Sequence, residues 1–278
     1  MENFFESLFY PKRKFDFELQ NDIRYYNSER DGDQFQVEDI SAWIDGGIFK
    51  RRWDNRGHPN QYANDVYFSL CKEAAELALP IVDIASGPGL GLLPDILSIN
   101  PDTKTLATDA CPKVVEKWSQ FLRQQKSIES VDFASFSVNH IPFHSNSVPV
   151  ITSNLGFSSL RYAGPDQVNG INEAFRVLKP GGYIFAIENE FADMQVVRKV
   201  FDLWGRENWF KNNELNWSQR FRRAGFTIES EMPHLTRIEN ADWEFGEVAA
   251  GFGLDLVVKF TAYKLRKISA EKIAEFPE

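Results

Sequence analysis

The most constraining feature of this sequence is a short apolar run that leads directly into a loop with glycines at alternate positions. Residues 81–91 read I-V-D-I-A-S-G-P-G-L-G, and a helical segment follows at residues 92–97. In such a strand–loop–helix unit, glycines let the backbone approach a ligand closely, and the helix N-terminus offers unpaired N–H groups. The segment therefore predicts a ligand site at the end of a buried strand.

Two acids sharpen this prediction. Asp83 lies inside the strand, where a purely structural strand would carry valine or isoleucine, and a buried carboxylate without partners costs several kcal/mol. Asp109 ends the next predicted strand, about twenty residues beyond the loop, where an acid can accept both hydroxyls of a ribose. The pair indicates a site for a nucleoside-type ligand. Two alternatives stay open: Asp83 as a carboxylate that only anchors the loop, and Asp109 as a helix N-cap.

Short apolar runs alternate with helical segments over most of the chain. The helical segments are residues 92–97, 114–125 and 167–178, and the predicted strands are residues 79–85, 105–108, 131–138, 148–153, 183–188, 226–231 and 254–264. This alternation is typical of βαβ units and a mainly parallel sheet. Pro149 has no N–H, so we place it at the first residue of its strand. The K-P-G-G run at residues 179–182 predicts a helix end followed by a tight turn.

Residues 1–60 follow a different pattern. Residues 15–19 and 34–37 alternate as short strands do, and a polar, turn-rich stretch at residues 27–33 separates them. We therefore divide the chain into an N-terminal appendage, residues 1–60, and a domain, residues 61–278. The appendage is expected to hold a small β element or to act as a substrate lid.

Composition narrows the classes of partner. The chain carries 31 Lys and Arg against 40 Asp and Glu, a net charge of −9, so a nucleic-acid partner is not expected. No apolar window of about eighteen residues occurs, and the acidic N-terminus lacks the bases of a signal peptide, so neither a membrane span nor export is expected. Cys71 and Cys111 are too few for a zinc cluster and the four histidines lack ligand spacing, so no metal is expected. The low cysteine usage favours the cytoplasm.

The motifs resemble those of the class I S-adenosylmethionine-dependent methyltransferases, especially the quinone-biosynthesis branch. Residues 83–91 and the L-A-T-D run at 106–109 are similar to the first two motifs of that family. Two later stretches resemble further motifs of the family: N-H-I-P-F-H-S-N-S at residues 139–147 and A-F-R-V-L-K-P-G-G at residues 174–182. The resemblance covers residues 62–190, residues 224–226 and the final strand. It implies a Rossmann-like α/β fold: a seven-stranded, mostly parallel sheet with helices on both faces and an antiparallel last strand.

The resemblance also implies S-adenosyl-L-methionine as cofactor and assigns residues to its parts. Asp83 and the backbone of residues 87–89 would hold the methionine end, Asp109 would take the ribose hydroxyls, and Ala110 would flank the adenine. The full set of cofactor-binding residues that it implies is Asp83, Ala85, Ser86, Gly87, Pro88, Gly89, Asp109, Ala110, Ser137, Val138, Ser153 and Asn154.

Two further pairs in this set lie at the ends of later strands. Ser137 and Val138 would reach the adenine ring edge, and Ser153 and Asn154 would line the methyl-donor pocket. The family usually has an acid where Ser137 stands, and a neutral hydroxyl accepts a weaker hydrogen bond than a carboxylate does. The sequence thus departs from the family in how it reads the adenine.

The predicted function is methyl transfer from S-adenosylmethionine to a small-molecule acceptor by direct in-line displacement. No residue is identified as a general base, so no catalytic residue is named. Three alternatives stay open: an RNA or protein methyltransferase that uses the appendage for recognition, a non-catalytic cofactor-binding module, and a nicotinamide-dependent dehydrogenase. The glycine spacing and Asp83 disfavour the last of these. The acceptor and the oligomeric state are not defined by the sequence.

Two kinds of cluster outside the motifs, one basic and one aromatic, allow two interpretations each. The basic clusters at residues 50–52 and 220–223 are interpreted as solvated faces, or as anion-binding groups if they border the pocket. An aromatic cluster would either wall a pocket for a ring-bearing acceptor or face the core, and the core is favoured. Its members are Phe201, Trp204, Trp209, Phe210 and Trp217.

Overall fold

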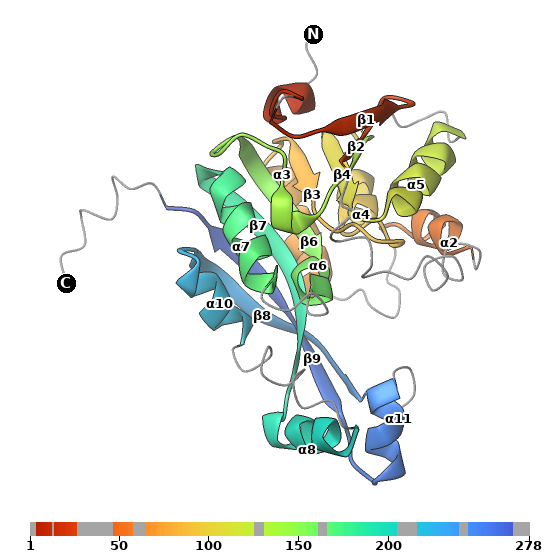
Figure 1. Cartoon of the computed structure of the whole chain (residues 1–278), viewed down its shortest axis with the longest axis vertical. Coiled ribbons are helices and arrows are strands. Elements are labelled where there is room, and N and C mark those ends of the chain that lie inside the picture. Colours follow the sequence, from red (N-terminus) through yellow and green to blue (C-terminus); the bar gives the residue numbers. More distant parts are fainter. Residues whose placement is uncertain are drawn as a thin grey trace, which may run out of the picture.

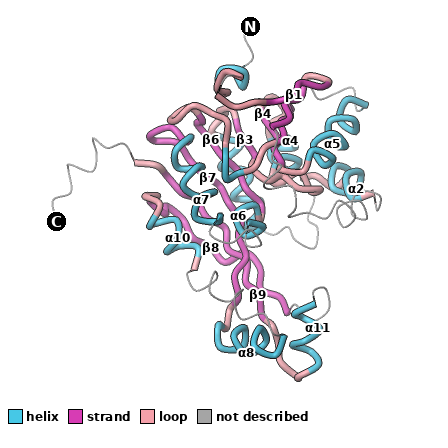
Figure 2. Tube along the Cα trace, in the orientation of Figure 1, coloured by secondary structure: helices cyan, strands magenta, loops and turns pink. Residues whose placement is uncertain are grey.

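The computed structural model describes residues 4–12, 14–26, 47–57, 65–124, 131–160, 166–204, 216–238 and 244–268. Within these residues the strands form one mixed sheet with helices on both faces (Figures 1 and 2). The strands are β1 (Phe17–Gln20), β2 (Ile23–Tyr26), β3 (Ile81–Asp83), β4 (Thr105–Asp109), β5 (Val131–Ser135), β6 (Val148–Asn154), β7 (Leu178–Phe191), β8 (Thr227–Ile238) and β9 (Val257–Arg266). The helices are η1 (Phe4–Leu8), α2 (Ile48–Asp54), α3 (Asp65–Glu76), α4 (Leu93–Ile99), α5 (Pro112–Gln124), η3 (Val138–His140), α6 (Gly156–Ser159), α7 (Asp166–Val177), α8 (Met194–Trp204), α10 (Trp217–Arg223) and α11 (Glu244–Gly251).

The strand order in the sheet is β1-β2-β5-β4-β3-β6-β7-β9-β8. Strands β3 to β7 pair in parallel, and β9 pairs antiparallel with both β7 and β8. The predicted Rossmann-like α/β fold with an antiparallel last strand is confirmed. The described sheet has nine strands and not the predicted seven, because β1 and β2 of the N-terminal segment join its edge beside β5.

Two apolar cores lie on opposite faces of the sheet, because successive strand residues point to opposite sides. Val82 and Ile151 belong to the core that α6, α7 and α10 cover. Their neighbours Ile81 and Val150 belong to the core that α2, α3, α4 and α5 cover. Near-continuous apolar runs in β3 and β6 are what this burial on both faces requires.

The N-terminal hairpin differs in part from its prediction. Its first strand is β1, but its second strand is β2, which follows after a two-residue turn at Asn21 and Asp22. Both turn residues adopt positive φ, 51° and 62°, as a type I′ hairpin turn requires. Residues 34–37, predicted as the second strand, lie outside the described residues. The boundary between residues 60 and 61 stays a prediction.

Pro149 is the second residue of β6, so its placement at the first residue is wrong by one. The pairing of β6 with β7 shifts register between Val148 and Val150, opposite the K-P-G-G run. This irregularity accommodates a residue that has no N–H to donate. The predicted end of the preceding helix is confirmed to within one residue, since α7 ends at Val177. The K-P-G-G run, predicted as a tight turn, lies instead within β7 at this register shift, where Gly181 adopts a φ of 81°.

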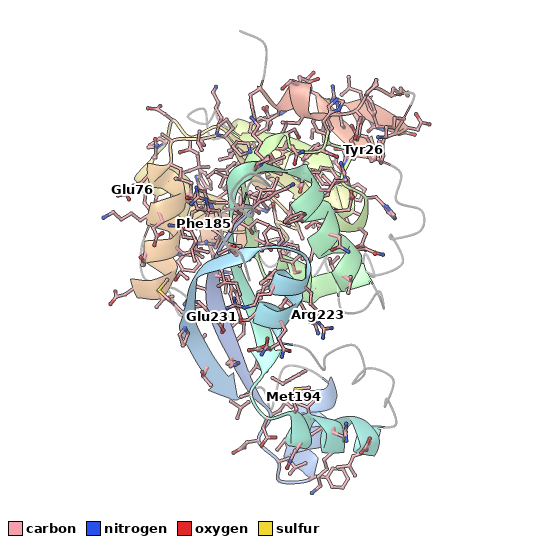
Figure 3. All side chains as sticks on the ribbon, turned by 90° about the vertical axis from the view of Figure 1, so that its left-hand side faces the viewer. Tyr26, Glu76, Phe185, Met194, Arg223 and Glu231 are labelled. Carbon is pink, nitrogen blue, oxygen red and sulfur yellow. The ribbon has the colours of Figure 1, made fainter. Side chains whose placement is uncertain are left out.

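Strands β7, β8 and β9 extend beyond the other strands and carry α8 and α11 at their far end (Figure 1). A small separate core forms there, which includes Val197 and Val200 of α8 and Ala249 of α11. Figure 3 shows how far apart the two ends of the molecule are: Tyr26 of β2 lies at one end and Met194 of α8 near the other. The predicted site lies between these ends, at the carboxyl ends of the central strands.

Candidate cofactor site

The glycine loop joins β3 to α4 in a tightly coiled path. Ala85, Gly87, Leu90 and Gly91 all adopt positive φ, between 50° and 57°. The Ser86 N–H donates to the carbonyl of Thr108 on β4 over 2.8 Å, which ties the loop to the neighbouring strand. A left-handed conformation is unusual for residues that carry a Cβ, so Ala85 and Leu90 are held in this conformation by the surrounding contacts.

The glycines of this loop have different surroundings. A Cβ added to Gly89 would meet no atom within 4 Å, and one added to Gly87 would meet only the Ala85 carbonyl at 4.0 Å. At Gly91 the same atom would lie 2.1 Å from a carboxylate oxygen of Asp83. Gly87 and Gly89 therefore border open space, whereas Gly91 has no room for any side chain. Gly91 was missed as a site residue, although the third glycine of the repeat was its signal.

Asp83 is fully buried at the end of β3. The Thr152 hydroxyl donates to its Oδ1 over 2.5 Å, and Oδ2 is buried with no hydrogen-bond partner among the described residues. Desolvation raises the pKa of Asp83 to about 7. The carboxyl therefore has an unused acceptor at the base of the glycine loop. Thr152 was missed, because a threonine in a strand has no distinctive local pattern.

Asp109 ends β4 and is 8% exposed. The Gly87 N–H donates to its Oδ2 and the Cys111 N–H to its Oδ1, each over 2.8 Å. Desolvation raises the pKa of Asp109, and these two backbone bonds oppose the shift. Each carboxylate oxygen accepts one bond here and has room for another. The neighbouring Ala110 is half-buried.

Ser137 and Val138 lie beside this acid. The Phe136 N–H donates to the Asp109 carbonyl over 3.1 Å, which joins the end of β5 to the end of β4. The Ser137 Oγ accepts a bond from the Asn139 N–H over 3.2 Å and caps η3. Ser137 is 5% exposed and Val138 is 3% exposed. Both residues are thus near the predicted adenine side, largely buried.

Ser153 and Asn154 end β6 on the other side of the loop. Ser153 is fully buried, and its hydroxyl donates to Glu188 Oε1 over 3.2 Å, while Asn154 is half-buried. A Cβ on Gly156 would lie 3.1 Å from the Cβ of Ala85, so the start of α6 packs closely against the glycine loop. Of the predicted pair, Asn154 is the more accessible.

Glu188 of β7 is a buried acid that the sequence analysis missed. It accepts bonds from the backbone N–H groups of Phe157 and Ser158 as well as from Ser153. Desolvation raises its pKa to about 7. These contacts fix α6 against the ends of β6 and β7. The signal was the same as for Asp83: an acid inside an apolar strand.

The structure brings the predicted residues together around one loop. Asp83 and Asp109 contact it from adjacent strands, Ser137 and Val138 follow the strand next to Asp109, and Asn154 lies across the loop at the end of β6. The partly exposed members, which form the surface of the site, are Ala85, Gly87, Pro88, Gly89, Ala110 and Asn154.

Two later motifs are held to each other by Arg176 of α7. Its guanidinium donates to the carbonyls of Ile141 and Phe143, each over 2.8 Å, and pairs with Glu173. Glu173 in turn accepts a bond from the Ile141 N–H over 3.0 Å. These contacts between the two motifs therefore stabilise the segment that follows Ser137.

Trp217 favours the core interpretation of the aromatic cluster. It is 3% exposed, its Nε1 donates to the Asn189 carbonyl over 2.7 Å, and its ring lies near Phe157 and Phe221. Trp209 and Phe210 lie outside the described residues, as do the side chains of Phe201 and Trp204. The pocket-wall interpretation is not supported for Trp217.

Comparison with known proteins matches residues 82–186 to a methyltransferase domain family. A demethylmenaquinone methyltransferase of Lactococcus lactis is 25% identical over 183 residues, which cover 56% of this chain and 69% of that protein. A ubiquinone/menaquinone biosynthesis C-methyltransferase of Bartonella henselae is 34% identical over 74 residues, about 27% of each chain. A crystal structure from Bacillus halodurans, assigned as a methyltransferase, has a TM-score of 0.51 at 16% identity and covers 73% of this chain and 99% of its own.

Residues 82–186 are thus similar to a methyltransferase domain, and the four motifs that resemble the class I S-adenosylmethionine-dependent methyltransferases all lie within this region. The enzyme uses S-adenosylmethionine as its cofactor, and within the class it resembles the quinone-biosynthesis branch. The region of the match begins at β3 and ends within β7, so it contains the glycine loop and both acids.

The described residues contain neither a membrane-spanning helix nor a cluster of metal-binding side chains. None of their helices combines the length and the apolar character that crossing a membrane requires. They also bring no three histidine, cysteine or acidic side chains together in a way that could hold a metal ion. The expectation that the protein uses no metal stays a prediction.

Proposed function

We propose that S-adenosylmethionine binds across the carboxyl ends of β3, β4 and β6, with the glycine loop beneath it. Asp109 accepts the two ribose hydroxyls, and Asp83 faces the amino group of the methionine moiety. The residues fit these groups: Asp109 has room for one more bond at each oxygen, and Asp83 Oδ2 is a buried acceptor without a hydrogen-bond partner among the described residues. Charge-assisted bonds to hydroxyl and ammonium donors satisfy both carboxylates.

One observation carries this proposal: a single loop joins both acids. The Gly87 N–H donates to Asp109, and Gly91 lies directly against the Asp83 carboxylate. Between them, Gly87 and Gly89 face open space that a side chain would fill. In open α/β sheets, ligands bind at this edge of the strands.

The remaining predicted residues take roles that fit their burial. Ala110 flanks the adenine. Ser137 already accepts a bond from Asn139, so its O–H is the group that can donate to an adenine ring nitrogen. Val138 packs beneath that contact, and Asn154 lines the methyl-donor side in preference to the buried Ser153.

For the acceptor, we propose a small molecule with a quinol-type ring. The support comes from the curated relatives, of which two are named for demethylmenaquinone and align with this chain over 69% and 77% of their own lengths. The ring carbon of such a molecule becomes nucleophilic when a neighbouring hydroxyl loses its proton. The cytoplasm is the proposed location, supported by the free, buried thiols of Cys71 and Cys111.

In the proposed mechanism the protein mainly aligns two molecules. The bound cofactor supplies an already activated methyl group. The glycine loop, Asp83 and Asp109 orient the cofactor at both of its ends, and alignment of this kind can supply much of the rate enhancement of a bimolecular transfer. Residues 1–60 remain the proposed acceptor-recognition segment, but no lid is proposed for η1, β1, β2 and α2, because these elements pack on the sheet and its cores. No general base is assigned.

Substitution of Asp109 tests this function. Calorimetry with S-adenosylhomocysteine is expected to show a roughly tenfold to few-hundredfold weaker Kd for Asp109→Ala, because two charge-assisted bonds are lost. Asp109→Asn is expected to show an intermediate loss, since it keeps the shape and one acceptor oxygen. Asp102→Asn, a change at an exposed acid before β4, is the matched control and should bind as the wild type does.

Wild-type affinity in both Asp109 variants would contradict the ribose assignment. The acceptor is tested separately, by methyl transfer from labelled S-adenosylmethionine to a naphthoquinol that lacks the ring methyl group. Turnover with total RNA or protein and none with the quinol would contradict the proposed acceptor while leaving the cofactor site intact.

A further inference from the structure

A buried ion pair links α2 to α4, the helix that follows the glycine loop. Arg52 Nη2 donates to Asp95 Oδ2 over 2.5 Å, and the two side chains are 15% and 2% exposed. The interpretation of residues 50–52 as a solvated face is therefore wrong for Arg52. Its buried partner lies 43 residues further along the chain, so no local pattern could reveal the pair.

Asp95 accepts bonds from three residues in two segments of the chain. Besides Arg52, the Tyr67 hydroxyl of α3 donates to its Oδ2 over 2.7 Å. The Gly57 N–H, in the turn after α2, donates to its Oδ1 over 2.6 Å. Arg52 Nη2 also lies 2.6 Å from the Tyr67 hydroxyl. The segment at residues 47–57 is thus fastened to α3 and α4 through one carboxylate.

The residue after Arg52 anchors the same helix. Trp53 is 3% exposed, and its ring centroid lies 6.5 Å from that of Trp118 in the core beneath α5. The α2 backbone is thereby fixed on the body of the protein, and Arg52 extends from a rigid base. A guanidinium held in this way can impose a geometry on its partners.

The network reaches the glycine loop itself. Arg52 Nη2 lies 3.4 Å from the Gly91 carbonyl, and Asp95 lies in the first turn of α4, directly after the loop. Gly91 in turn lies against the Asp83 carboxylate, with no room even for a Cβ. A shift of Gly91 would therefore move the surroundings of Asp83.

We propose that Arg52 is a positioning residue for the cofactor loop. Through Asp95 and the Gly91 carbonyl it fixes the end of the loop beside Asp83, so that α2 controls how the amino-acid end of the cofactor is held. The inference rests on the proposed role of residues 83–91 in cofactor binding. The described contacts of Arg52 include none with Asp109, so the nucleoside end should be unaffected.

Two ligands separate these ends in an experiment. S-adenosylhomocysteine has both a nucleoside and an amino-acid end, whereas 5′-methylthioadenosine lacks the amino-acid end. Arg52→Lys keeps a cation for Asp95, but the lysine side chain ends one bond short of Nη2, the atom that contacts Asp95, the Tyr67 hydroxyl and the Gly91 carbonyl. Calorimetry is expected to show about tenfold weaker binding of S-adenosylhomocysteine and less than about twofold change for methylthioadenosine. Arg51→Lys, on the exposed side of the same helix, is the matched control and should change neither Kd.

A second variant keeps the test valid if Arg52→Lys does not fold. In Arg52→Met/Asp95→Asn both buried charges are removed together, and the amide oxygen at position 95 keeps an acceptor for the Tyr67 hydroxyl or the Gly57 N–H. The same selective loss is expected. Wild-type affinity for S-adenosylhomocysteine in a folded variant, or an equal loss for both ligands, would overturn the positioning role. If the wild-type protein binds neither ligand, the proposed function itself fails, which is a different result.

Discussion

The two sides of the glycine loop each hold an aspartate, yet the two carboxylates have different surroundings. Asp109, on the side of β4, accepts a backbone N–H bond at each oxygen and is 8% exposed. Asp83, on the side of β3, is fully buried, with one oxygen bonded to Thr152 and the other without a hydrogen-bond partner among the described residues. Asp109 is thus held by backbone N–H groups at both oxygens, whereas Asp83 Oδ2 is an acceptor that a ligand can still use.

The comparison shows how environment gives one residue type two roles. Desolvation raises the pKa of Asp109 and the backbone bonds from Cys111 and Gly87 oppose the shift, so both oxygens of this carboxylate are held in place before a ligand binds. At Asp83 desolvation dominates and places the pKa at about 7, so its charge depends on whether a cation is near. We expect the nucleoside end of the cofactor to be bound by a carboxylate that backbone bonds hold in place, and the amino-acid end by a titrating group.

The largest effect is expected from alanine at Gly91, compared with alanine at Gly89. Gly91→Ala forces a Cβ into the Asp83 carboxylate and strains a φ of 54°, so we expect a lowered Tm and loss of measurable S-adenosylhomocysteine binding. Gly89→Ala meets no protein atom within 4 Å, so its Tm should stay at the wild-type value while binding weakens about tenfold. Thermal unfolding and calorimetry on both variants check this. Equal behaviour of the two variants would remove the distinction between a structural and a ligand-facing glycine.

A smaller effect is expected from pH. Without ligand the Asp83 carboxyl, with a pKa of about 7, is mostly protonated at pH 5.5. A bound ammonium group favours the ionised form, so binding releases a proton and the affinity should rise as pH rises to about 7, then level off. We expect the Kd for S-adenosylhomocysteine to fall roughly tenfold between pH 5.5 and 7.5. Calorimetry across this range measures it.

Two controls sharpen the pH experiment. Asp83→Asn removes the titrating group and should flatten the profile, and methylthioadenosine, which has no ammonium group, should give a flat profile with the wild-type protein. A wild-type Kd for S-adenosylhomocysteine that does not change with pH would show that Asp83 does not face the amino group.

The sequence predicted the parts of the site that are continuous along the chain. The run from Asp83 to Gly89 and the acid at Asp109 have local signatures: an acid in an apolar strand, alternating glycines, and an acid at the next strand end. The parallel order of β3, β4 and β6 follows from the alternation of strands and helices. These features depend on near neighbours, so a single sequence contains them.

The parts that the sequence missed depend on contacts between distant segments. Arg52 finds Asp95 across 43 residues, and Glu188 meets the N–H groups of α6 across about 30. The hairpin partner of β1 was placed at residues 34–37, because the Asn21–Asp22 turn is short and lacks glycine. Nothing near Arg52 or Glu188 in the sequence marks their partners, which tertiary packing selects. The hairpin is the exception, because its Asn21–Asp22 turn is a local signal that was overlooked.

A crystal structure of the wild-type protein with S-adenosylhomocysteine tests the central claim most directly. We expect the nucleoside above the glycine loop, both ribose hydroxyls within hydrogen-bond distance of the Asp109 carboxylate, and the amino group facing Asp83 Oδ2. Ligand density elsewhere on the protein, or a ribose that makes no contact with Asp109, would contradict the account.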